Sequence, residues 1–329
     1  MTESSVPRHP LFVVGMPRSG TTLLSSLLNG HHSLVMAPET HYFTRCWTGT
    51  PIHDWTDVER MLDRLDQQPG VHDMALSEEE WAAIRERLRD LDAPNHGDIL
   101  RALLETYAAR YDVPAWGEKT PDHLRVVPEM AEQFPDAVFV AIVRDPRDVA
   151  LSLRGLPWSR RTLPEKAWTW RRYAARIARY HETLGDRFFS LRYEDLITAP
   201  EGTLRDLCAF LGMPFRASML RLEAQEDRPF DAEREPWKQK SRRQIDPSNR
   251  EKWRTQMPET GRVLVDLIAG HWLADYGYAR PPIRWRSALV GSLLRRVAGA
   301  FLQWGRRKVQ NLRSGHTFSD DATPQWLEE

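Results

Sequence analysis

Cysteine is scarce in this chain. Only Cys46 and Cys208 occur among the 329 residues, and they lie far apart. Two distant thiols exclude a disulfide framework, and because no Cys-x-x-Cys pair or His/Cys cluster is present, the sequence predicts no metal site. Residues 1–15 also lack the apolar run of a secretory leader. The expected compartment is therefore the reducing cytoplasm.

An excess of charge and a long apolar run are missing as well. The 46 Lys and Arg residues balance 46 Asp and Glu residues, so the overall charge gives no reason to expect a nucleic-acid partner. No stretch approaches the roughly 18 apolar residues of a membrane span. With 41% hydrophobic residues, the chain has enough apolar material for one large domain or two small ones.

The sequence does contain an alternation of apolar runs and helical patterns. Runs typical of buried parallel strands occupy residues 11–15, 137–143 and 188–192. Helical patterns lie between and after them, at residues 20–30, 146–153, 164–184 and 200–211. This order predicts an α/β, P-loop-like three-layer fold, in which helices cover both faces of a central parallel sheet.

A helical insertion is predicted between the first two of these strands. Residues 55–111 repeat apolar side chains at three- and four-residue spacing, and Ser77 with Glu80 matches a capping box. We expect these helices to pack on the sheet, where they could cover a cleft.

The end of the chain has a different character. From Pro281 to Gly315 there are eight Arg or Lys residues and no acidic residue, and apolar residues recur at helical spacing. This pattern predicts a basic amphipathic helix and a polar tail over residues 281–329, after a main domain of residues 1–280. The helix could lie on an anionic membrane surface. Packing on the domain, or on a second subunit in a homo-oligomer, is the favoured interpretation.

A glycine-bounded loop, Gly15-Met-Pro-Arg-Ser-Gly-Thr-Thr22, follows the first strand and precedes its helix. Backbone N–H groups at such a helix start converge on an anion, and Gly20 permits close approach of a ligand. A nucleotide kinase would have Lys directly after the second glycine. Here that position is Thr21, and the cation, Arg18, lies within the loop. The loop therefore favours an anionic group other than the usual Mg-triphosphate.

This Pro-Arg-Ser-Gly-Thr-Thr loop resembles the 5′-phosphosulfate loop of sulfotransferases that use the donor PAPS (3′-phosphoadenosine 5′-phosphosulfate). In that family a cation at the position of Arg18 contacts the sulfate and the bridging oxygen. The resemblance implies that the loop residues bind the donor, namely Arg18, Ser19, Gly20, Thr21 and Thr22. It also implies that no metal is needed, because Arg and Lys supply the positive charge.

Later motifs resemble the same family. Arg144 ends the second strand and Ser152 follows eight residues on, as in the family's 3′-phosphate site. A guanidinium and a hydroxyl so placed can hold one phosphate. Tyr193, in Arg-Tyr-Glu-Asp, matches a tyrosine near the adenine. Lys252 matches a donor-binding lysine, whereas the family's further arginine after Ser152 has no counterpart except the nearer Arg154.

Tyrosylprotein sulfotransferases are the most similar branch, and they suggest the catalytic residues. Their catalytic Glu lies as far from the loop arginine as Glu39 does from Arg18, so Glu39 is the first candidate for the general base. His41 is the alternative, because histidine needs little tuning near neutral pH. Lys119, in Gly-Glu-Lys-Thr-Pro, corresponds to a lysine that stabilises the leaving oxygen. Ser241 corresponds to a serine near the transferring group, with Ser248 as a competitor.

These patterns predict a sulfotransferase that moves a sulfuryl group from PAPS to an acceptor hydroxyl on a small molecule, a sugar or a lipid. Two alternatives remain open at this point. One is a small-molecule kinase that uses the same loop, and the other is a nucleotide-binding protein without catalysis, tethered by its basic C-terminal helix.

Overall fold

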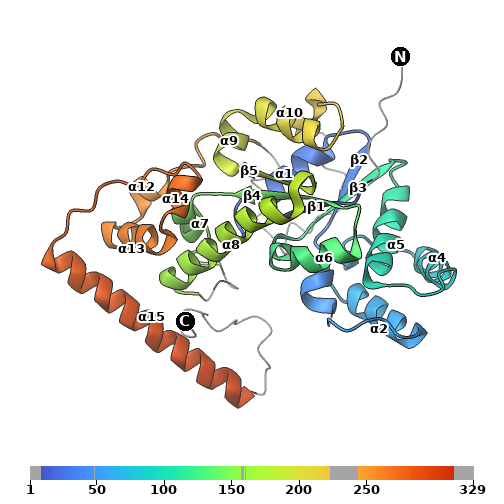
Figure 1. Cartoon of the computed structure of the whole chain (residues 1–329), viewed down its shortest axis with the longest axis horizontal. Coiled ribbons are helices and arrows are strands. Elements are labelled where there is room, and N and C mark those ends of the chain that lie inside the picture. The colour runs from blue at the N-terminus through green and yellow to red at the C-terminus, as the bar shows by residue number, and fades with distance from the viewer. Residues whose placement is uncertain (1–8, 48, 157–158, 160, 223–243, 315–329) are drawn as a thin grey trace.

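A parallel five-stranded sheet forms the centre of the molecule (Figure 1). The computed structural model describes residues 9–47, 49–156, 159, 161–222 and 244–314, with side chains through residue 306. The strands are β1 (Leu11–Gly15), β2 (Leu34–Ala37), β3 (Ala115–Lys119), β4 (Val138–Val143) and β5 (Phe188–Arg192). Their order in the sheet is β2-β3-β1-β4-β5. The three strands predicted from the sequence are confirmed, and β2 and β3 were not predicted.

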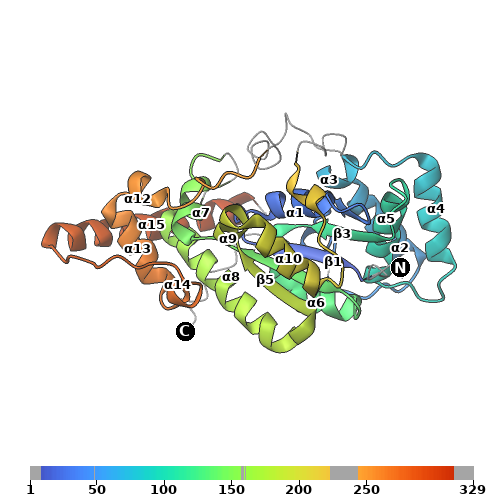
Figure 2. The same cartoon turned by 90° about the horizontal axis from the view of Figure 1, so that it is seen from above.

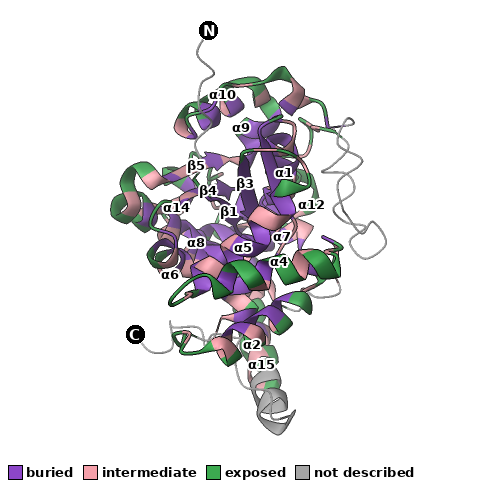
Figure 3. Cartoon of the chain, turned by 90° about the vertical axis from the view of Figure 1, so that its right-hand side faces the viewer, coloured by how far each residue is buried: buried purple, intermediate pink, exposed green. Residues whose placement is uncertain are grey.

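Helices cover both faces of the sheet, which confirms the predicted three-layer architecture (Figure 2). Alternate residues of β1 enter opposite cores: Phe12 and Val14 pack with the insertion helices and the long central helix, whereas Leu11 and Val13 pack with the helix after β1. This alternation places a dry core on each side, because side chains of a strand point to opposite faces in turn. Strands β1, β2 and β3 are accordingly buried along their whole length, and the edge strand β5 is partly exposed (Figure 3).

The helices that flank the strands are short, apart from one. They are α1 (Thr21–Asn29), α6 (Val127–Gln133), α7 (Pro146–Ser152), α8 (Leu163–Leu184), α9 (Tyr193–Thr198) and α10 (Pro200–Phe210). Single turns of other types occur at η1 (Tyr42–Cys46), η2 (Pro121–Val126), η3 (Gly185–Arg187) and η4 (Ala217–Leu220). Pro146 and Pro200 begin α7 and α10, where a missing N–H costs nothing.

The predicted helical insertion is confirmed between β2 and β3. It consists of α2 (Trp55–Asp66), α3 (Pro69–His72), α4 (Glu78–Arg89) and α5 (His96–Ala109). The expected capping box of Ser77 and Glu80 starts α4. Ile99 and Leu103 of α5 are buried in the same core as Phe12, so the insertion packs on the sheet.

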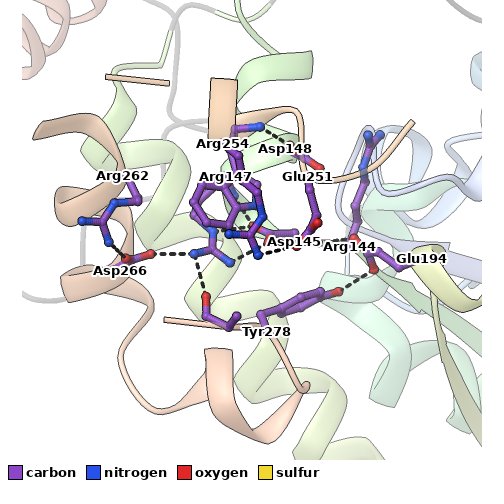
Figure 4. Close-up of polar contacts among 12 residues, drawn as sticks. Arg144, Asp145, Arg147, Asp148, Glu194, Glu251, Arg254, Arg262, Asp266 and Tyr278 are labelled. Carbon is purple, nitrogen blue, oxygen red and sulfur yellow. Dashed lines mark hydrogen bonds and ion pairs between the residues drawn. The ribbon is translucent and has the colours of Figure 1, made fainter. Parts of the chain in front are cut away.

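The C-terminal part of the described chain consists of α12 (Trp253–Gln256), α13 (Glu259–Ala269), α14 (Trp272–Asp275) and α15 (Ser287–Ser314). These helices lie at the end of the sheet opposite the insertion (Figures 1 and 2). Arg147 of α7 links them to the domain: it is almost fully buried and donates to Asp145, to Asp266 of α13 and to the carbonyl oxygen of Ala279 (Figure 4). None of the helices in the described part of the chain is both long and apolar enough to span a bilayer.

Candidate active site

The site residues predicted from the sequence gather at one edge of the sheet. Because all five strands are parallel, their carboxyl ends meet at that edge. Gly15 ends β1, Lys119 ends β3 and Val143 ends β4, and predicted residues lie at or directly after these ends. Open parallel sheets bind ligands at this edge, beside the strand where the strand order reverses. Here that strand is β1, which lies between β3 and β4.

The loop between β1 and α1 is shaped for close approach of an anion to its backbone. Arg18 and Gly20 have positive φ values of 75° and 104°. A Cβ on residue 20 would lie 2.3 Å from Cδ2 of Tyr193, so only glycine fits there. Ser19 is buried, and its Oγ has no hydrogen-bond partner among the described residues. Thr21 and Thr22 open α1, whose first turn no side chain caps.

Arg18, Ser152 and Arg144 form one continuous polar group. Arg18 Nε donates to Ser152 Oγ at 3.1 Å, and Arg144 Nη1 donates to the Arg18 carbonyl oxygen at 3.3 Å. Arg18, in the loop after β1, lies more than 120 positions before Arg144 at the end of β4 and Ser152 of α7. The two groups of residues predicted to hold opposite ends of one nucleotide are therefore adjacent.

Tyr193, the first residue of α9, lies against this group. Its ring centroid is 4.3 Å from the guanidinium carbon of Arg144, a cation–π contact. Asn249 Nδ2 donates to the Tyr193 hydroxyl at 2.7 Å, and Arg144 Nη2 donates to the Asn249 carbonyl oxygen at 2.9 Å. Burial raises the pKa of Tyr193, which keeps its hydroxyl protonated. Asn249 thus links two predicted site residues, although the sequence analysis gave it no role.

A buried network behind Arg144 holds the end of β4 in place (Figure 4). Trp170 Nε1 donates to the Arg144 carbonyl oxygen at 2.8 Å. The Asp145 N–H donates to Glu194 Oε1 at 3.0 Å, and the Tyr278 hydroxyl donates to Glu194 Oε2 at 3.0 Å. Burial raises the pKa of Glu194. The position of the Arg144 side chain therefore depends on contacts from α8, α9 and the segment after α14.

Glu39, His41 and Lys119 form a second group at the ends of β2 and β3. Lys119 Nζ contacts Glu39 Oε1 directly, and His41 Nε2 lies 3.3 Å from Glu39 Oε2. Lys119 is buried, whereas Glu39 and His41 are partly exposed. The structure thus brings the predicted base, its alternative and the predicted lysine together.

Glu118 fixes the backbone beside this second group through hydrogen bonds. It is fully buried, and its Oε1 accepts hydrogen bonds from the Thr40 N–H and Thr40 Oγ1, each at 3.0 Å, and from Thr120 Oγ1. Its Oε2 lies 3.2 Å from Nδ1 of the buried His123. Burial alone would raise the pKa of Glu118, but His123 and these hydrogen bonds outweigh it and hold the pKa below its ordinary value. Thr40, between Glu39 and His41, is fixed by this carboxylate.

The helical insertion contacts the same segment through α3. A Cβ on Gly70 would lie 2.1 Å from the carbonyl oxygen of Glu39 and 3.0 Å from its nitrogen. Only a glycine permits α3 to approach the Glu39 backbone so closely. The insertion therefore borders the candidate site, although the sequence analysis assigned none of its residues a chemical role.

One protein-family model matches the part of the chain that contains most of the site residues. The model of the sulfotransferase family matches residues 10–217, more than half of the chain.

The chain belongs to the sulfotransferase family.

Individual relatives agree with this assignment. The chain is 26% identical over 283 residues to the protein-tyrosine sulfotransferase of Drosophila melanogaster, an alignment that covers 83% of this chain and 52% of that protein. It is 26% identical over 339 residues to the omega-hydroxy-beta-dihydromenaquinone-9 sulfotransferase Stf3 of Mycobacterium tuberculosis, covering 88% and 81% respectively. The chain spans about half the length of the fly and zebrafish tyrosine sulfotransferases that it matches.

A solved sulfotransferase structure has the same fold. The sulfotransferase domain of the Synechococcus PCC 7002 olefin synthase superposes with a TM-score of 0.58 at 23% identity, covering 85% of this chain and all of that domain. This likeness concerns the fold alone. It agrees with the α/β architecture of the sheet and its flanking helices.

The remaining predicted residues of this sulfotransferase-family chain are less closely placed. Lys252 is exposed on the segment before α12, next to Trp253, whose N–H donates to Asp148 of α7 at 2.9 Å. Ser241 lies outside the described residues. Ser248, its competitor, is exposed and donates to Asp246. Arg154 is exposed just beyond the end of α7.

Three residues of the site were missed in the sequence for identifiable reasons. Glu118 lies in a short polar strand, Ala-Trp-Gly-Glu-Lys, that does not have the composition of a buried strand. Asn249 belongs to a turn, Asp-Pro-Ser-Asn, that is typical of solvent-exposed loops. Gly70 resembles an ordinary glycine between two helices. The Glu directly before Lys119 in an otherwise apolar Ala-Trp-Gly segment was an available signal, because a carboxylate in a strand needs a partner.

Proposed function

We propose that this chain transfers a sulfuryl group from PAPS to an acceptor hydroxyl. The observation that carries the proposal is the contact between Arg144 and the Arg18 carbonyl oxygen, with Ser152 on the Arg18 side chain. This contact places the loop after β1 next to the end of β4 and α7. A nucleotide with phosphate at both its 3′ and 5′ positions requires two such neighbouring anion-binding segments. Membership of the sulfotransferase family supports the same activity.

The described residues fit such a donor. Ser19 Oγ and Arg144 Nε are buried hydrogen-bond donors without a partner in the described chain, and buried groups of this kind normally have one. The missing side chain of Gly20 lets the Tyr193 ring pack directly on the loop backbone. In the proposal Arg18, Ser19, Thr21 and Thr22 hold the 5′-phosphosulfate. Arg144 and Ser152 then hold the 3′-phosphate, and Tyr193 lies toward the base.

Glu39 is the proposed general base. It accepts the proton of the acceptor hydroxyl while the hydroxyl oxygen forms a bond to sulfur and the bond from sulfur to the bridging phosphate oxygen breaks. The other product is adenosine 3′,5′-bisphosphate. Lys119 contacts Glu39 and lies at the end of β3, beside the loop after β1, so its ammonium group can neutralise charge that develops between base and donor.

Lys119 and Arg18 then supply positive charge from two strands, β3 and β1. Electrostatic stabilisation of developing charge is often the largest contribution to catalysis, and it needs donors that are already in place. Glu118 and Thr40 keep the Glu39 segment in position, since Thr40 is held by the buried carboxylate. The family match favours sulfuryl transfer over the kinase alternative, in agreement with Thr21 at the position where a kinase loop has Lys.

Nucleotide binding is the first test. Titration calorimetry of the full chain with adenosine 3′,5′-bisphosphate should give saturable binding, and Arg144→Ala and Ser152→Ala should weaken it by roughly tenfold or more, since each hydrogen bond to a charged group contributes about 1.5–3 kcal/mol. Arg179→Ala, an exposed arginine of α8, is the matched control and should bind as the unaltered chain does. No binding by the unaltered chain would refute the proposal.

Turnover is the second test, and it separates an enzyme from a nucleotide-binding protein. The chain is incubated with PAPS and a library of phenols, sugars and lipid alcohols, and sulfated products are followed by mass spectrometry. We expect at least one hydroxyl compound to gain a sulfuryl group, with Glu39→Gln as the inactive control. Tight nucleotide binding without any product across the library would favour the non-catalytic alternative.

A further inference from the structure

One side of α15 is already used in packing. Leu289, Leu293 and Ala300 are buried, and the two leucines form a small core with Val263 and Leu264 of α13. Val297 lies partly buried against the same core. The expectation that the C-terminal helix packs on the domain is therefore met for this side of the helix.

A second apolar stripe on α15 is exposed. It consists of Val290, Leu294, Phe301 and Leu302, and the exposed fractions of Leu294 and Leu302 are both 66%. At 100° per residue these four positions form a continuous surface next to the packed one, and Ala298 completes it. Trp285, just before the helix, is 59% exposed.

Exposed apolar side chains of this size are rare elsewhere in the described chain. Seven large hydrophobic residues are exposed, and five of them lie between residues 285 and 302; the seven are Leu91, Leu267, Trp285, Val290, Leu294, Phe301 and Leu302. Such a concentration on one surface marks an interaction site, whereas single exposed apolar residues need no explanation.

The charge around this stripe has one sign. Arg295 and Arg306 are exposed and follow directly beside Leu302 in the helical projection, and Arg284 and Arg286 flank Trp285. No acidic residue occurs from residue 281 to residue 315, although the whole chain is neutral. An apolar stripe bordered by arginines is complementary to anionic headgroups above acyl chains. A second copy of α15 would instead bring arginines against arginines.

We propose that α15 and the segment that begins at Arg284 dock on an anionic lipid surface. The helix lies in the plane of the headgroups, with Leu294 and Leu302 entering the acyl boundary and Arg295 and Arg306 contacting lipid phosphates. Trp285 inserts at the same depth, where its ring is favoured. Because the neighbouring side of α15 remains packed on α13, the sulfotransferase domain is held next to the membrane.

Vesicle flotation with the full chain tests this proposal. Vesicles of phosphatidylcholine mixed with phosphatidylserine should carry the protein upward, whereas pure phosphatidylcholine vesicles should carry little. The double variant Leu294→Glu/Leu302→Glu should lower partitioning to the mixed vesicles by roughly tenfold or more, since it places two charges in the inserted stripe. Leu91→Glu, at an exposed leucine between α4 and α5, is the matched control and should float normally.

A second variant keeps the test independent of the leucines. Arg295→Glu/Arg306→Glu should weaken binding to the anionic vesicles, and added salt should weaken binding of the unaltered chain, because exposed charges are screened. Thermal melts should be unchanged in both double variants, since all four side chains are exposed. The proposal is overturned if the full chain ignores anionic vesicles, or if Leu294→Glu/Leu302→Glu floats as Leu91→Glu does. Self-association through this stripe, without vesicle binding, would equally overturn it.

Discussion

Glu39 and His41 lie side by side after β2, and their contacts distinguish the roles proposed for them. Glu39 contacts Lys119 with one oxygen and His41 with the other. A base that loses its carboxylate should lose proton transfer, which general-base catalysis accelerates by about 10²–10⁴-fold. We therefore expect Glu39→Gln to lower kcat by about that factor while the affinity for adenosine 3′,5′-bisphosphate is unchanged.

The matched variant His41→Gln should lower kcat much less, because the imidazole contacts Glu39, whereas Glu39 itself contacts Lys119 at the end of β3. Steady-state kinetics with one acceptor, together with calorimetry of both variants, gives the comparison. If His41→Gln lost more activity than Glu39→Gln, the base would be His41.

Glu118 is proposed to position the Glu39 segment, and its effect should depend on pH. In the folded chain its pKa lies below the ordinary value, because His123 and hydrogen bonds from Thr40 and Thr120 favour the carboxylate and outweigh burial. Its contribution to the free energy of unfolding is therefore complete above the unfolded pKa and is lost as pH falls through the folded pKa. Hydrogen bonds to a charged group contribute about 1.5–3 kcal/mol each, so Glu118→Gln should lower the free energy of unfolding at neutral pH.

Urea denaturation across a pH series measures this difference. The gap between the unaltered chain and Glu118→Gln should be largest near neutrality and should shrink at acid pH. The pH profile of kcat separates a positioning role from a purely structural one. It should shift in Glu118→Gln if Thr40 no longer holds Glu39 in place. A gap that stayed constant with pH would contradict the ionised state assigned to Glu118.

At the scale of single elements, α3 is the contact between the insertion and the catalytic segment. Gly70→Ala would bring a Cβ to 2.1 Å from the Glu39 carbonyl oxygen, so α3 or the Glu39 backbone must shift. We expect kcat to fall by roughly tenfold or more, because small misplacement of a reacting group is costly. Nucleotide affinity should be kept, since Gly70 lies beside Glu39 and the donor residues lie on other strands.

Gly202→Ala in α10 is the control for this change, because a Cβ there would meet nothing within 4 Å. Both variants are compared by kinetics and by calorimetry with adenosine 3′,5′-bisphosphate. Equal activity of Gly70→Ala and Gly202→Ala would show that α3 has no influence on the base.

The sequence predicts well those strands that are both apolar in composition and buried in the fold. The runs at β1, β4 and β5 are uniformly apolar or nearly so, and local pattern identified them. Strand β2 has only four residues, and β3 carries Gly, Glu and Lys because its end forms part of the site. A strand whose polar residues are paired by distant partners, here Thr40 and Glu39, cannot be recognised from its own segment.

At the scale of the whole molecule, Arg147 joins the C-terminal helices to α7. It pairs with Asp145 and with Asp266 of α13, and all three side chains are almost fully buried. Arg147→Met would leave Asp145 without its guanidinium partner, and loss of one member of a buried pair costs about 3–5 kcal/mol. We expect a loss of that size in urea denaturation, with weaker nucleotide binding because Asp145 follows Arg144.

Arg254→Met provides the control, since its ion pair with Glu251 is exposed on both sides and exposed pairs contribute about 0–1 kcal/mol. If Arg147→Met were no more destabilising than Arg254→Met, the network of Figure 4 would not hold the C-terminal helices in place.

The sequence could not predict which residues from distant segments would meet in the site. Arg18, Arg144, Ser152 and Tyr193 were found because each follows a recognisable motif, and the fold then placed them together. Asn249 has no motif of its own, and its importance arises only because a segment more than 100 residues away in sequence folds over Arg144.

The order of strands in the sheet divides the labour of the proposed enzyme. Donor residues follow β1, β4 and β5, whereas Glu39 and Lys119 follow or end β2 and β3, and the insertion lies in the connection between those last two strands. Replacing residues 55–111 with another helical module would therefore alter which alcohol is accepted and leave the nucleotide pocket as it is. In a fold divided in this way, acceptor specificity can change in evolution while the donor-binding residues stay the same.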